Sequence, residues 1–351
     1  MSIPEIQQAW RVVGRGDPSK VLRFDRDVPV PKKPVKGEVL IKVHAVALNP
    51  VGYKIMRVAP SFVIKRPYIS ESDLAGTVVD ANGTSFKEGD RVYGWIPVPT
   101  IIKTRMGALA QYTRVPANNL VPIPENTSPV QAAGITLASM TAYQALFDVG
   151  GLQPEQSVFI NGGSSAVGAF AIQLAKAAGC TVTASASGKN EEYVRSLGAD
   201  KFVDYTKAPL HETLANQPPT PKYHVFLEAV GLIDTSLYTN SEAYLAPGGT
   251  FVSLGPQPKG FDIAAIVKVA WKVFLQPRFL GGTNRSWKLV QVRHKREDLE
   301  QIARYVAEGK VKPIVDSVYS FEDTLKAYDR LLTSRATGKV VIKVDPDVST
   351  E

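Results

Sequence analysis

The chain has 351 residues, which is more than one small core needs and suits two domains of ordinary size. Its hydrophobic share of 44% and charged share of 21% are those of a globular protein and exclude an intrinsically disordered chain. The formal net charge is +8, but no block of five or more like charges occurs, which argues against nucleic acid as a partner.

The first third of the chain has the pattern of short strands separated by turns. Apolar residues alternate partly with polar ones, and glycine and proline interrupt these runs. We therefore predict strands at residues 38–47, 73–79 and 91–95. The pattern then changes at residues 126–129, where Thr127 or Ser128 is suited to cap a helix, and the alanine-rich run to residue 147 is helical in type.

After Pro154, stretches typical of strands and of helices alternate. Predicted strands cover residues 157–161, 180–187, 201–203, 223–229 and 249–254, with 279–283 as the candidate for the last strand. Predicted helices cover residues 166–178, 190–197 and 236–245. Alternation at this spacing predicts a parallel, doubly wound sheet, and therefore an α/β fold class.

The C-terminal part resembles the first part again. Two amphipathic helices are predicted at residues 296–309 and 321–332, followed by a closing strand at 338–344. The expected layout is a β-rich domain built from residues 1–126 and 290–351, with an α/β domain of residues 127–289 between its two segments.

A glycine-rich turn leads from the predicted strand at 157–161 into the helix at 166–178. Gly163, Ser165 and Gly168 form G-x-S-x-x-G, a variant of the dinucleotide-binding fingerprint. The first glycine would permit a tight turn and the last a close helix packing, while the helix N-terminus offers free amides to a pyrophosphate. We predict that Gly163, Ser164, Ser165, Ala166, Val167 and Gly168 bind the cofactor. The alternative is a plain glycine–serine loop, which is disfavoured because strand, turn and helix follow in the required order.

The end of the next predicted strand indicates which nicotinamide cofactor is bound. An acidic residue there would hold the free 2′-hydroxyl of NAD, but residues 184–190 read Ala-Ser-Ala-Ser-Gly-Lys-Asn. Ser187 and Lys189, with Asn190 beside them, suit a 2′-phosphate through hydrogen bonds and one positive charge. The sequence therefore favours NADPH, although an exposed lysine at a helix start is a common alternative for Lys189.

These residues and their flanks resemble the zinc-free branch of the medium-chain dehydrogenase/reductases, the branch of the quinone oxidoreductases and enoyl reductases. The similarity runs from about Val39 to the closing strand. Its landmarks are Ala-Leu-Asn-Pro-Val-Gly-Tyr-Lys at 47–54, Ser-Asp-Leu-Ala-Gly at 72–76, Gly-Asp-Arg-Val-Tyr at 89–93, Thr-Ala-Tyr-Gln-Ala-Leu at 141–146, Leu-Gly-Ala-Asp at 197–200, Asp-Tyr at 204–205 and Gly-Lys-Val-Val at 338–341.

The resemblance implies a GroES-like substrate domain made from both ends of the chain and a Rossmann domain between them. It implies that Ser187, Lys189 and Tyr205 surround the adenosine 2′-phosphate. Asn49 and Thr141 would lie near the nicotinamide, and Leu254 and Gly255 beside the cofactor at a strand end. It also implies a homodimer joined through the edges of the Rossmann sheets.

The zinc-using relatives differ at the positions that would ligate the metal. They have a cysteine in place of Asn49, a His-Glu pair in place of Ser72 and Asp73, and a second cysteine near Leu137. They also carry four cysteines for a structural metal, whereas Cys180 is the only cysteine of this chain. A catalytic Zn²⁺ normally needs three protein ligands, so we predict no metal.

Without a Lewis acid, the site is poorly suited to ionise an alcohol. Hydride transfer from NADPH to a quinone or to the β-carbon of an enone needs less help, because the conjugated substrate carries the charge. Tyr53, Lys54 or water are candidates to supply the proton, although a lone tyrosine is more often a packed core aromatic. Gly52 stands where this branch usually has aspartate, which removes a polar group near the nicotinamide.

Three functions stay open at this point. The first is an NADPH-dependent reductase of quinones or activated alkenes, and the second is a trans-acting enoyl reductase of polyketide synthesis with an acyl-carrier partner. The third is an NADPH-binding protein with little turnover, which the glycine at position 52 mildly favours. A steady-state activity panel would separate the first function from the third, and carrier-bound substrates would separate out the second.

Residues 261–279, which include Trp271 and Phe274, form an apolar segment between late Rossmann strands. Our first interpretation is a helix that packs on its own domain or on a dimer partner. The second is an apolar wall of the substrate cleft, suited to bulky enones, and a similar placement occurs in the fungal trans-acting enoyl reductases.

Neither end of the chain nor its interior suggests a membrane segment. Residues 1–10 lack the basic start and apolar core of a signal peptide. The apolar run at 263–275 carries Lys268 and Lys272 and is too short to cross a bilayer. We therefore expect a soluble, cytoplasmic protein.

Overall fold

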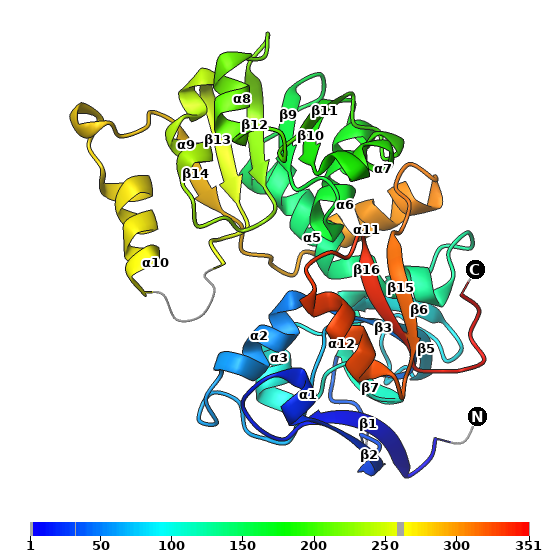
Figure 1. The fold of residues 1–351 in the computed structure, drawn as a ribbon. Coiled ribbons are helices and arrows are strands. Elements are labelled where there is room, and N and C mark those ends of the chain that lie inside the picture. The colour runs from blue at the N-terminus through cyan, green and yellow to red at the C-terminus, as the bar shows by residue number, and fades with distance from the viewer. Residues whose placement is uncertain (1–2, 32, 258–262, 351) are drawn as a thin grey trace. The chain divides into compact units, whose positions relative to one another are not determined.

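The computed structural model describes residues 3–31, 33–257 and 263–350, and it divides into two compact units (Figure 1). Unit 1 is made of Met1–Ala138 and His294–Glu351, and unit 2 is Ser139–Arg293. Unit 1 therefore draws on both ends of the chain, while unit 2 is continuous in sequence.

Unit 1 is organised around a seven-stranded, mainly antiparallel sheet. Its strand order is β15-β16-β3-β5-β6-β8, and β7 pairs with β3 beside this path. The strands are β3 (Glu38–Ala47), β5 (Asp73–Asp80), β6 (Arg91–Trp95), β7 (Tyr112–Pro116), β8 (Leu120–Pro122), β15 (Val315–Ser320) and β16 (Lys339–Lys343). The middle strand β3 is covered on both faces, which explains why its sequence alternates only partly.

A small sheet of three strands completes the β structure of unit 1. It has the order β2-β1-β4 and comprises β1 (Ile6–Val12), β2 (Leu22–Pro29) and β4 (Tyr68–Ile69). The indole N–H of Trp10 in β1 donates to the carbonyl of Phe321 at 2.8 Å, although the two residues lie 311 positions apart. This bond links the N-terminal strand to the C-terminal segment within one hydrophobic core.

The helices of unit 1 are short and lie around these sheets. They are α1 (Pro18–Val21), α2 (Pro50–Val58), α3 (Val98–Thr104), α4 (Pro129–Ala133), α11 (Arg296–Ala307) and α12 (Thr324–Leu332), with a 3-10 turn at Ala117–Asn119. Ser128 caps α4 as predicted, because its hydroxyl accepts from the Gln131 amide while the Gln131 side chain accepts from the Ser128 amide.

Unit 2 is built on a six-stranded sheet in which every neighbouring pair is parallel. Its order is β11-β10-β9-β12-β13-β14, which numbered from β9 is the order 3-2-1-4-5-6 of a Rossmann fold. The strands are β9 (Ser157–Asn161), β10 (Thr181–Ala186), β11 (Lys201–Asp204), β12 (Tyr223–Glu228), β13 (Leu245–Ser253) and β14 (Ser286–Leu289). The predicted fold class, a GroES-like domain with a Rossmann domain, is confirmed.

Helical segments of unit 2 connect its strands. They are α6 (Ala166–Ala177), α7 (Glu191–Ser196), α8 (Leu210–Asn216), α9 (Ser236–Thr239) and α10 (Ile263–Ala270), with α5 (Thr136–Tyr143) at the boundary with unit 1. Short 3-10 turns lie at Gly188–Asn190, Ser241–Ala243 and Arg278–Leu280, and π-helical turns at Gln144–Val149 and Trp271–Leu275. In the part of the chain that the structure describes, no helix is long and apolar enough to cross a membrane.

Two predictions for unit 2 are wrong in detail. The last strand is β14 and not residues 279–283, which contain a 3-10 turn; β14 is an edge strand with no fully buried side chain, so its Ser-Trp-Lys-Leu sequence carries no apolar run. The predicted helix at 236–245 ends early, because Leu245 begins β13 and pairs with Tyr223. Strand pairing thus overrides the local helical pattern there.

Candidate active site

The glycine-rich turn lies between β9 and α6, at the carboxyl end of the sheet. Gly162 has a left-handed backbone with φ of 83°, and a Cβ atom on Gly168 would lie 2.2 Å from the Gly162 carbonyl oxygen. The start of α6 therefore approaches the loop more closely than any side chain allows. This close backbone is the cradle that a pyrophosphate needs, so the turn fits a dinucleotide.

Gly163 and Ser165 have roles that differ from the sequence interpretation. The left-handed turn residue is Gly162 and not Gly163, whose missing side chain instead leaves room for Ala184 and Ile172. The Ser165 hydroxyl caps α6 by accepting from the Gly168 amide at 3.1 Å. The hydroxyl proton of Ser165 stays available for donation. Ser164, Ala166 and Val167 are half-buried along the same turn.

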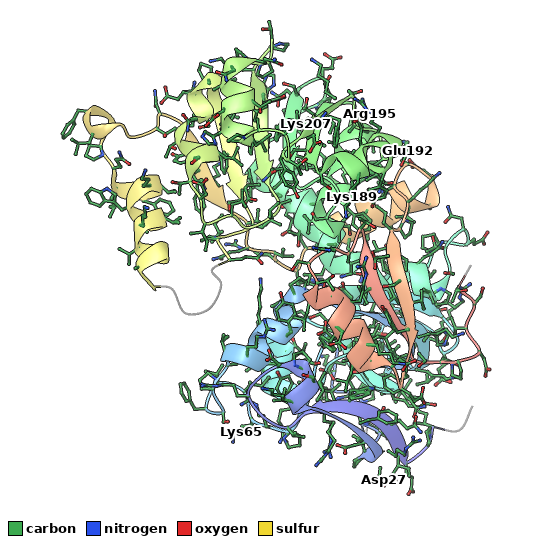
Figure 2. The ribbon with its side chains drawn as sticks, viewed as in Figure 1. Asp27, Lys65, Lys189, Glu192, Arg195 and Lys207 are labelled. Carbon is green, nitrogen blue, oxygen red and sulfur yellow. The ribbon has the colours of Figure 1, made fainter. Side chains whose placement is uncertain are left out.

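The residues predicted to surround a 2′-phosphate lie at the ends of two neighbouring strands. Ala186 and Asp204 pair across β10 and β11, so Ser187 and Tyr205 follow them side by side. The Asn190 side-chain nitrogen donates to the Ser187 hydroxyl at 3.3 Å, and Lys189 is exposed. Figure 2 shows Lys189 in the part of unit 2 around α7.

One carboxylate does lie beside this loop. A Cβ atom on Gly188 would lie 2.4 Å from an Asp204 carboxylate oxygen. Hydrogen bonds from the hydroxyl and amide of Thr206, and from the Gly188 amide, lower the pKa of Asp204. The Asp204 carboxylate is thus held by its own loop and packs against Gly188. The sequence did not indicate this role.

Leu254 and Gly255 follow β13, also at the carboxyl end of the sheet. The Leu254 amide donates to the carbonyl of Glu228, and Gly255 has φ of 92°. Glu228 is a buried carboxylate at the end of β12 that accepts from the amides of Val230, Gly231 and Leu232. Burial raises its pKa, against these hydrogen bonds. Glu228 therefore fixes the backbone conformation of the loop after β12. No pattern in the sequence indicated this role.

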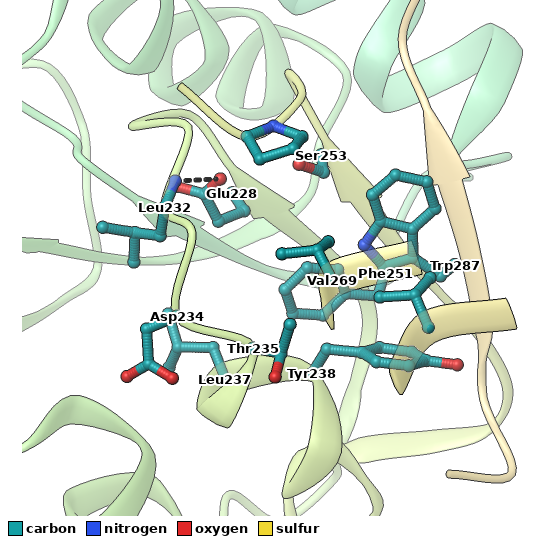
Figure 3. Close-up of a pocket in the computed structure, with 12 residues that line it drawn as sticks. Glu228, Leu232, Asp234, Thr235, Leu237, Tyr238, Phe251, Ser253, Val269 and Trp287 are labelled. Atoms are coloured by element: carbon teal, nitrogen blue, oxygen red, sulfur yellow. Dashed lines mark hydrogen bonds between the residues drawn. The ribbon is translucent and has the colours of Figure 1, made fainter. Parts of the chain in front are cut away.

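A small pocket lies below that loop, on the sheet face of unit 2 (Figure 3). Phe251, Val269 and Trp287 contribute apolar walls, and Glu228 and Asp234 contribute carboxylates. Val269 belongs to α10, and the Phe274 ring meets Trp287 edge-on at 5.2 Å.

These contacts bear on the apolar segment at 261–279, of which Phe261 and Asp262 lie outside the described residues. Val269 and Phe274 pack on unit 2 itself, which is the packing expected from the first interpretation. Trp271 and Leu275 nevertheless stay half or more exposed.

Strand register brings three polar side chains together in the core of unit 1. Ala47 pairs with both Asp73 and Val341, so Asn49, Asp73 and Lys339 meet beyond the end of β3. The Lys339 ammonium lies 3.1 Å from an Asp73 carboxylate oxygen and donates to the Asn49 side-chain oxygen. The Asn49 side-chain nitrogen in turn donates to Asp73 at 3.0 Å. Asn49 was predicted to lie near the nicotinamide. The structure shows that it is also part of a buried network with Asp73 and Lys339.

This network does not fit zinc. Burial raises the pKa of Asp73, while Lys339, Asn49 and the Leu137 amide act against that rise. The carboxylate is thus already engaged by an ammonium, an amide side chain and a backbone N–H. Asn49 and Ser72 offer no soft ligand, and no group of three or more His, Cys, Asp or Glu side chains among the described residues is placed to hold a metal.

The remaining predicted residues lie on helices. Thr141 is half-buried in α5 and belongs to unit 2, whereas Tyr53 and Lys54 belong to α2 in unit 1. Tyr53 packs against the core of unit 1, and the Arg57 guanidinium lies 4.9 Å from the centre of its ring. Burial lowers the pKa of Lys54.

A second buried carboxylate, Glu71, lies close to the start of α2. Glu71 accepts from the Tyr328 hydroxyl at 2.6 Å and from the backbone N–H of Asn49 at 2.9 Å. A Cβ atom on Gly52 would lie 1.8 Å from a Glu71 carboxylate oxygen. The Glu71 carboxylate therefore takes up the space that a side chain at position 52 would need. The glycine at position 52 is visible in the sequence, but its contact with Glu71, 19 positions away, is not.

Comparison with known proteins agrees with this geometry. The model of the alcohol dehydrogenase GroES-like domain matches residues 35–125, and that of the zinc-binding dehydrogenases matches residues 197–342. The trans-enoyl reductase pgmF of Aspergillus terreus is 32% identical over 98% of both chains. NAD(P)H oxidoreductase RTN4IP1 of Danio rerio is 30% identical over 97% of this chain and 92% of that protein. The solved quinone oxidoreductase of Coxiella burnetii has a TM-score of 0.79 at 26% identity, covering 97% of this chain and 99% of its own.

The chain therefore belongs to the medium-chain dehydrogenase/reductase superfamily, in the branch of the quinone oxidoreductases and enoyl reductases. As a member of that family it is an oxidoreductase whose relatives bind NAD(P)H.

Proposed function

We propose that the protein uses NADPH, without zinc, to reduce a quinone or the C=C bond of an α,β-unsaturated carbonyl compound. The observation that supports this most strongly is the buried Lys339–Asp73–Asn49 network. It brings the Lys339 ammonium against Asn49 and Asp73, two of the positions at which, by the resemblance, the zinc-using relatives carry other residues. Such a site has no Lewis acid to help ionise an alcohol, whereas a conjugated acceptor needs less help.

The turn at Gly163–Gly168 is proposed to hold the pyrophosphate of NADPH, with Asn49 and Thr141 near the nicotinamide. Leu254 and Gly255 are proposed to lie beside the cofactor at a strand end. The free amides at the start of α6 favour a negative charge, and the twelve-residue helix adds its dipole. NADPH supplies a hydride when it is bound. Domain boundaries near residues 126 and 290 would then separate the two chain segments of the substrate domain from the cofactor domain.

Ser187, Lys189, Asn190 and Tyr205 are proposed to bind the 2′-phosphate. We expect Lys189→Ala to raise the KM for NADPH about 10-fold, because a charge-assisted hydrogen bond contributes roughly 1.5–3 kcal/mol and exposure reduces it. The KM for NADH should change less than about two-fold, since NADH has no phosphate there. Lys207→Ala removes another exposed lysine of the same region and is the matched control (Figure 2). Equal effects on both cofactors would contradict this assignment.

Lys54 and Tyr53 are proposed as candidates to supply the proton that completes the reduction, at the α-carbon of an enone or at an oxygen of a quinone. Because burial lowers the pKa of Lys54, its ammonium gives up a proton more readily near neutral pH than an exposed lysine does. We expect Lys54→Met to lower kcat at least 10-fold with little change in the KM for NADPH. Tyr53→Phe should change kcat less than about three-fold, since the ring is packed in the core. The reverse order would favour Tyr53 as the donor.

A second candidate function is supported by the similarity to pgmF over the whole chain. In that case the substrate is an enoyl group carried by an acyl-carrier protein. Steady-state rates with a free crotonyl thioester and with the same acyl group on a carrier protein would separate the two. A preference of 100-fold or more for the carrier-bound form would favour the trans-acting enoyl reductase. Similar rates would favour the reductase of free quinones and enones.

The resemblance to this branch also supports a homodimer joined through Rossmann sheet edges. The edge available on one side of the unit 2 sheet is β14. Sedimentation analysis of the wild-type chain would measure its mass against the 38.1 kDa of one subunit.

A further inference from the structure

Unit 1 contains a mainly apolar pocket between α2, α3 and β4. The two helices lie side by side in Figure 1, and Ile55 of α2 and Ile101 of α3 contribute apolar walls. Ile64 forms a further part of the wall. Two ionisable side chains interrupt this apolar lining, namely Tyr68 of β4 and Glu71.

Tyr68 has a polar atom without a partner. Its side chain is 2% exposed, and its buried hydroxyl has no hydrogen-bond partner among the residues that the structure describes. Burial raises the pKa of Tyr68 to about 12, so the hydroxyl keeps its proton and is a donor at neutral pH. Leaving such a group unpaired costs about 1–3 kcal/mol, and a ligand oxygen in the pocket would remove that cost.

Glu71 is held in a conformation that its residue type disfavours. Its backbone has φ of 67°, in the left-handed region where glycine is preferred, and it is 2% exposed. A buried carboxyl at a strained position is a feature that concentrates at functional sites. Tyr328 and the Asn49 amide fix its orientation, and Gly52 leaves room for it.

We propose that this pocket binds the conjugated carbonyl group of the substrate, with the carbonyl oxygen accepting hydrogen bonds from the Tyr68 hydroxyl and from the protonated carboxyl of Glu71. The proposal rests on the proposed reduction of quinones or enones. In this arrangement the two donors stabilise the negative charge that develops on the oxygen during hydride transfer. These two donors take the place of a Lewis acid, while Lys54 or Tyr53 supplies the proton.

The protonation of Glu71 gives the proposal a pH dependence. Burial raises the pKa of Glu71 to about 7, with a further contribution from the negative charge of Asp73. Hydrogen bonds from Tyr328 and Asn49 and the positive charge of Lys339 lower the pKa and offset part of this rise. Tyr68 also faces Glu71 in the pocket. The donor form of the carboxyl exists below this pKa and is lost as pH rises through it. The rate of reduction should therefore fall above about pH 7.

Binding can be measured without cofactor. Cyclohex-2-enone labelled with ¹³C at the carbonyl should show a downfield shift of that resonance when it binds the apoprotein at pH 6, because hydrogen bonds polarise the carbonyl. Tyr68→Phe should remove a large part of this shift. Glu71→Gln has an amide N–H that donates at every pH, so it should keep the shift at pH 6 and also at pH 8, where the wild type should lose much of it. Tyr93→Phe is the matched control, since the buried Tyr93 hydroxyl likewise has no hydrogen-bond partner among the described residues but does not line the pocket. An unchanged shift in Tyr68→Phe, together with a wild-type shift that is the same at pH 6 and pH 8, would overturn the proposal.

Kinetics test the catalytic part of the proposal. Tyr68→Phe should lower kcat about 100-fold to 1000-fold, the usual effect of removing one oxyanion donor. Glu71→Gln still donates through its amide N–H, so it should keep kcat at pH 6 within about 10-fold of wild type and should abolish the fall in rate near pH 7. Lys54→Met should leave that fall in place. If the wild type binds the enone with the shift but reduces neither enones nor quinones, the proposed function fails while the pocket stands. If Tyr68→Phe turns over within three-fold of wild type and Glu71→Gln keeps the wild-type fall in rate above pH 7, the pocket proposal fails and the proposed function stands.

Discussion

Replacing Lys339 by methionine should lower the free energy of unfolding by about 3–5 kcal/mol at pH 7, the usual cost of removing one partner of a buried ion pair. Lys339 and Asp73 are 4% and 0% exposed, so water screens neither. The variant leaves Asp73 buried without its cation, and the carboxyl must then take up a proton or stay charged in the core. Burial already raises the pKa of Asp73, so the loss should shrink as the pH falls, because a protonated Asp73 no longer needs the cation.

Two further variants make this result specific. Lys339→Met combined with Asp73→Asn removes both charges and should recover much of the stability, because the asparagine still accepts from the Leu137 amide. Arg195→Met breaks an exposed pair with Glu191 on one helix and should cost only about 0.3–0.5 kcal/mol. Chemical denaturation measures all three. A loss for Lys339→Met as small as that for Arg195→Met would mean that the buried network is not a stabilising unit.

Gly168→Ala should raise the Kd for NADPH by about 100-fold or more, which corresponds to about 2.7 kcal/mol. The added Cβ would lie 2.2 Å from the Gly162 carbonyl oxygen and 2.9 Å from its carbon, and both are backbone atoms that cannot rotate away. The turn must therefore move from the start of α6, and the amides that face the pyrophosphate move with it. Titration of nucleotide fluorescence measures the Kd.

Gly14→Ala is the matched control for this prediction. A Cβ at Gly14 would make ordinary contact with Val21 at 3.4 Å, and Gly14 is not in the left-handed region. It should leave the Kd within about two-fold of wild type. Circular dichroism would confirm that Gly168→Ala is folded before its affinity is interpreted. Wild-type affinity in a folded Gly168→Ala variant would show that the turn does not bind the pyrophosphate.

Much of the fold was predictable because it depends on local pattern. The alternation of strands and helices after Pro154 indicated the parallel sheet, and Gly168 marked the turn before α6. The edge strand β14 was not predictable, because an edge strand buries too little to need an apolar run. The N-terminal strands β1 and β2 also went unpredicted; their residues alternate imperfectly, with a bulge between Gln7 and Ala9.

The site was less predictable, because its main contacts join residues far apart in sequence. Lys339 appeared only as part of a landmark, and nothing local indicated that it meets Asp73 across 266 positions. Glu71 and Tyr328 are likewise 257 positions apart. The glycine at position 52 was the one local signal, because a missing side chain in a helix start indicates that something else occupies the space. Strand register, which composition cannot show, decides these contacts.

Oxidation of NADPH, followed at 340 nm with menadione and with cyclohex-2-enone as acceptors, decides whether the reduction is zinc-free and NADPH-dependent. Protein treated with o-phenanthroline and dialysed would be compared with untreated protein and with protein given added Zn²⁺. We predict the same turnover in all three, and at least 10-fold higher kcat/KM with NADPH than with NADH. Activity that disappears with the chelator and returns with Zn²⁺, or a preference for NADH, would contradict the account.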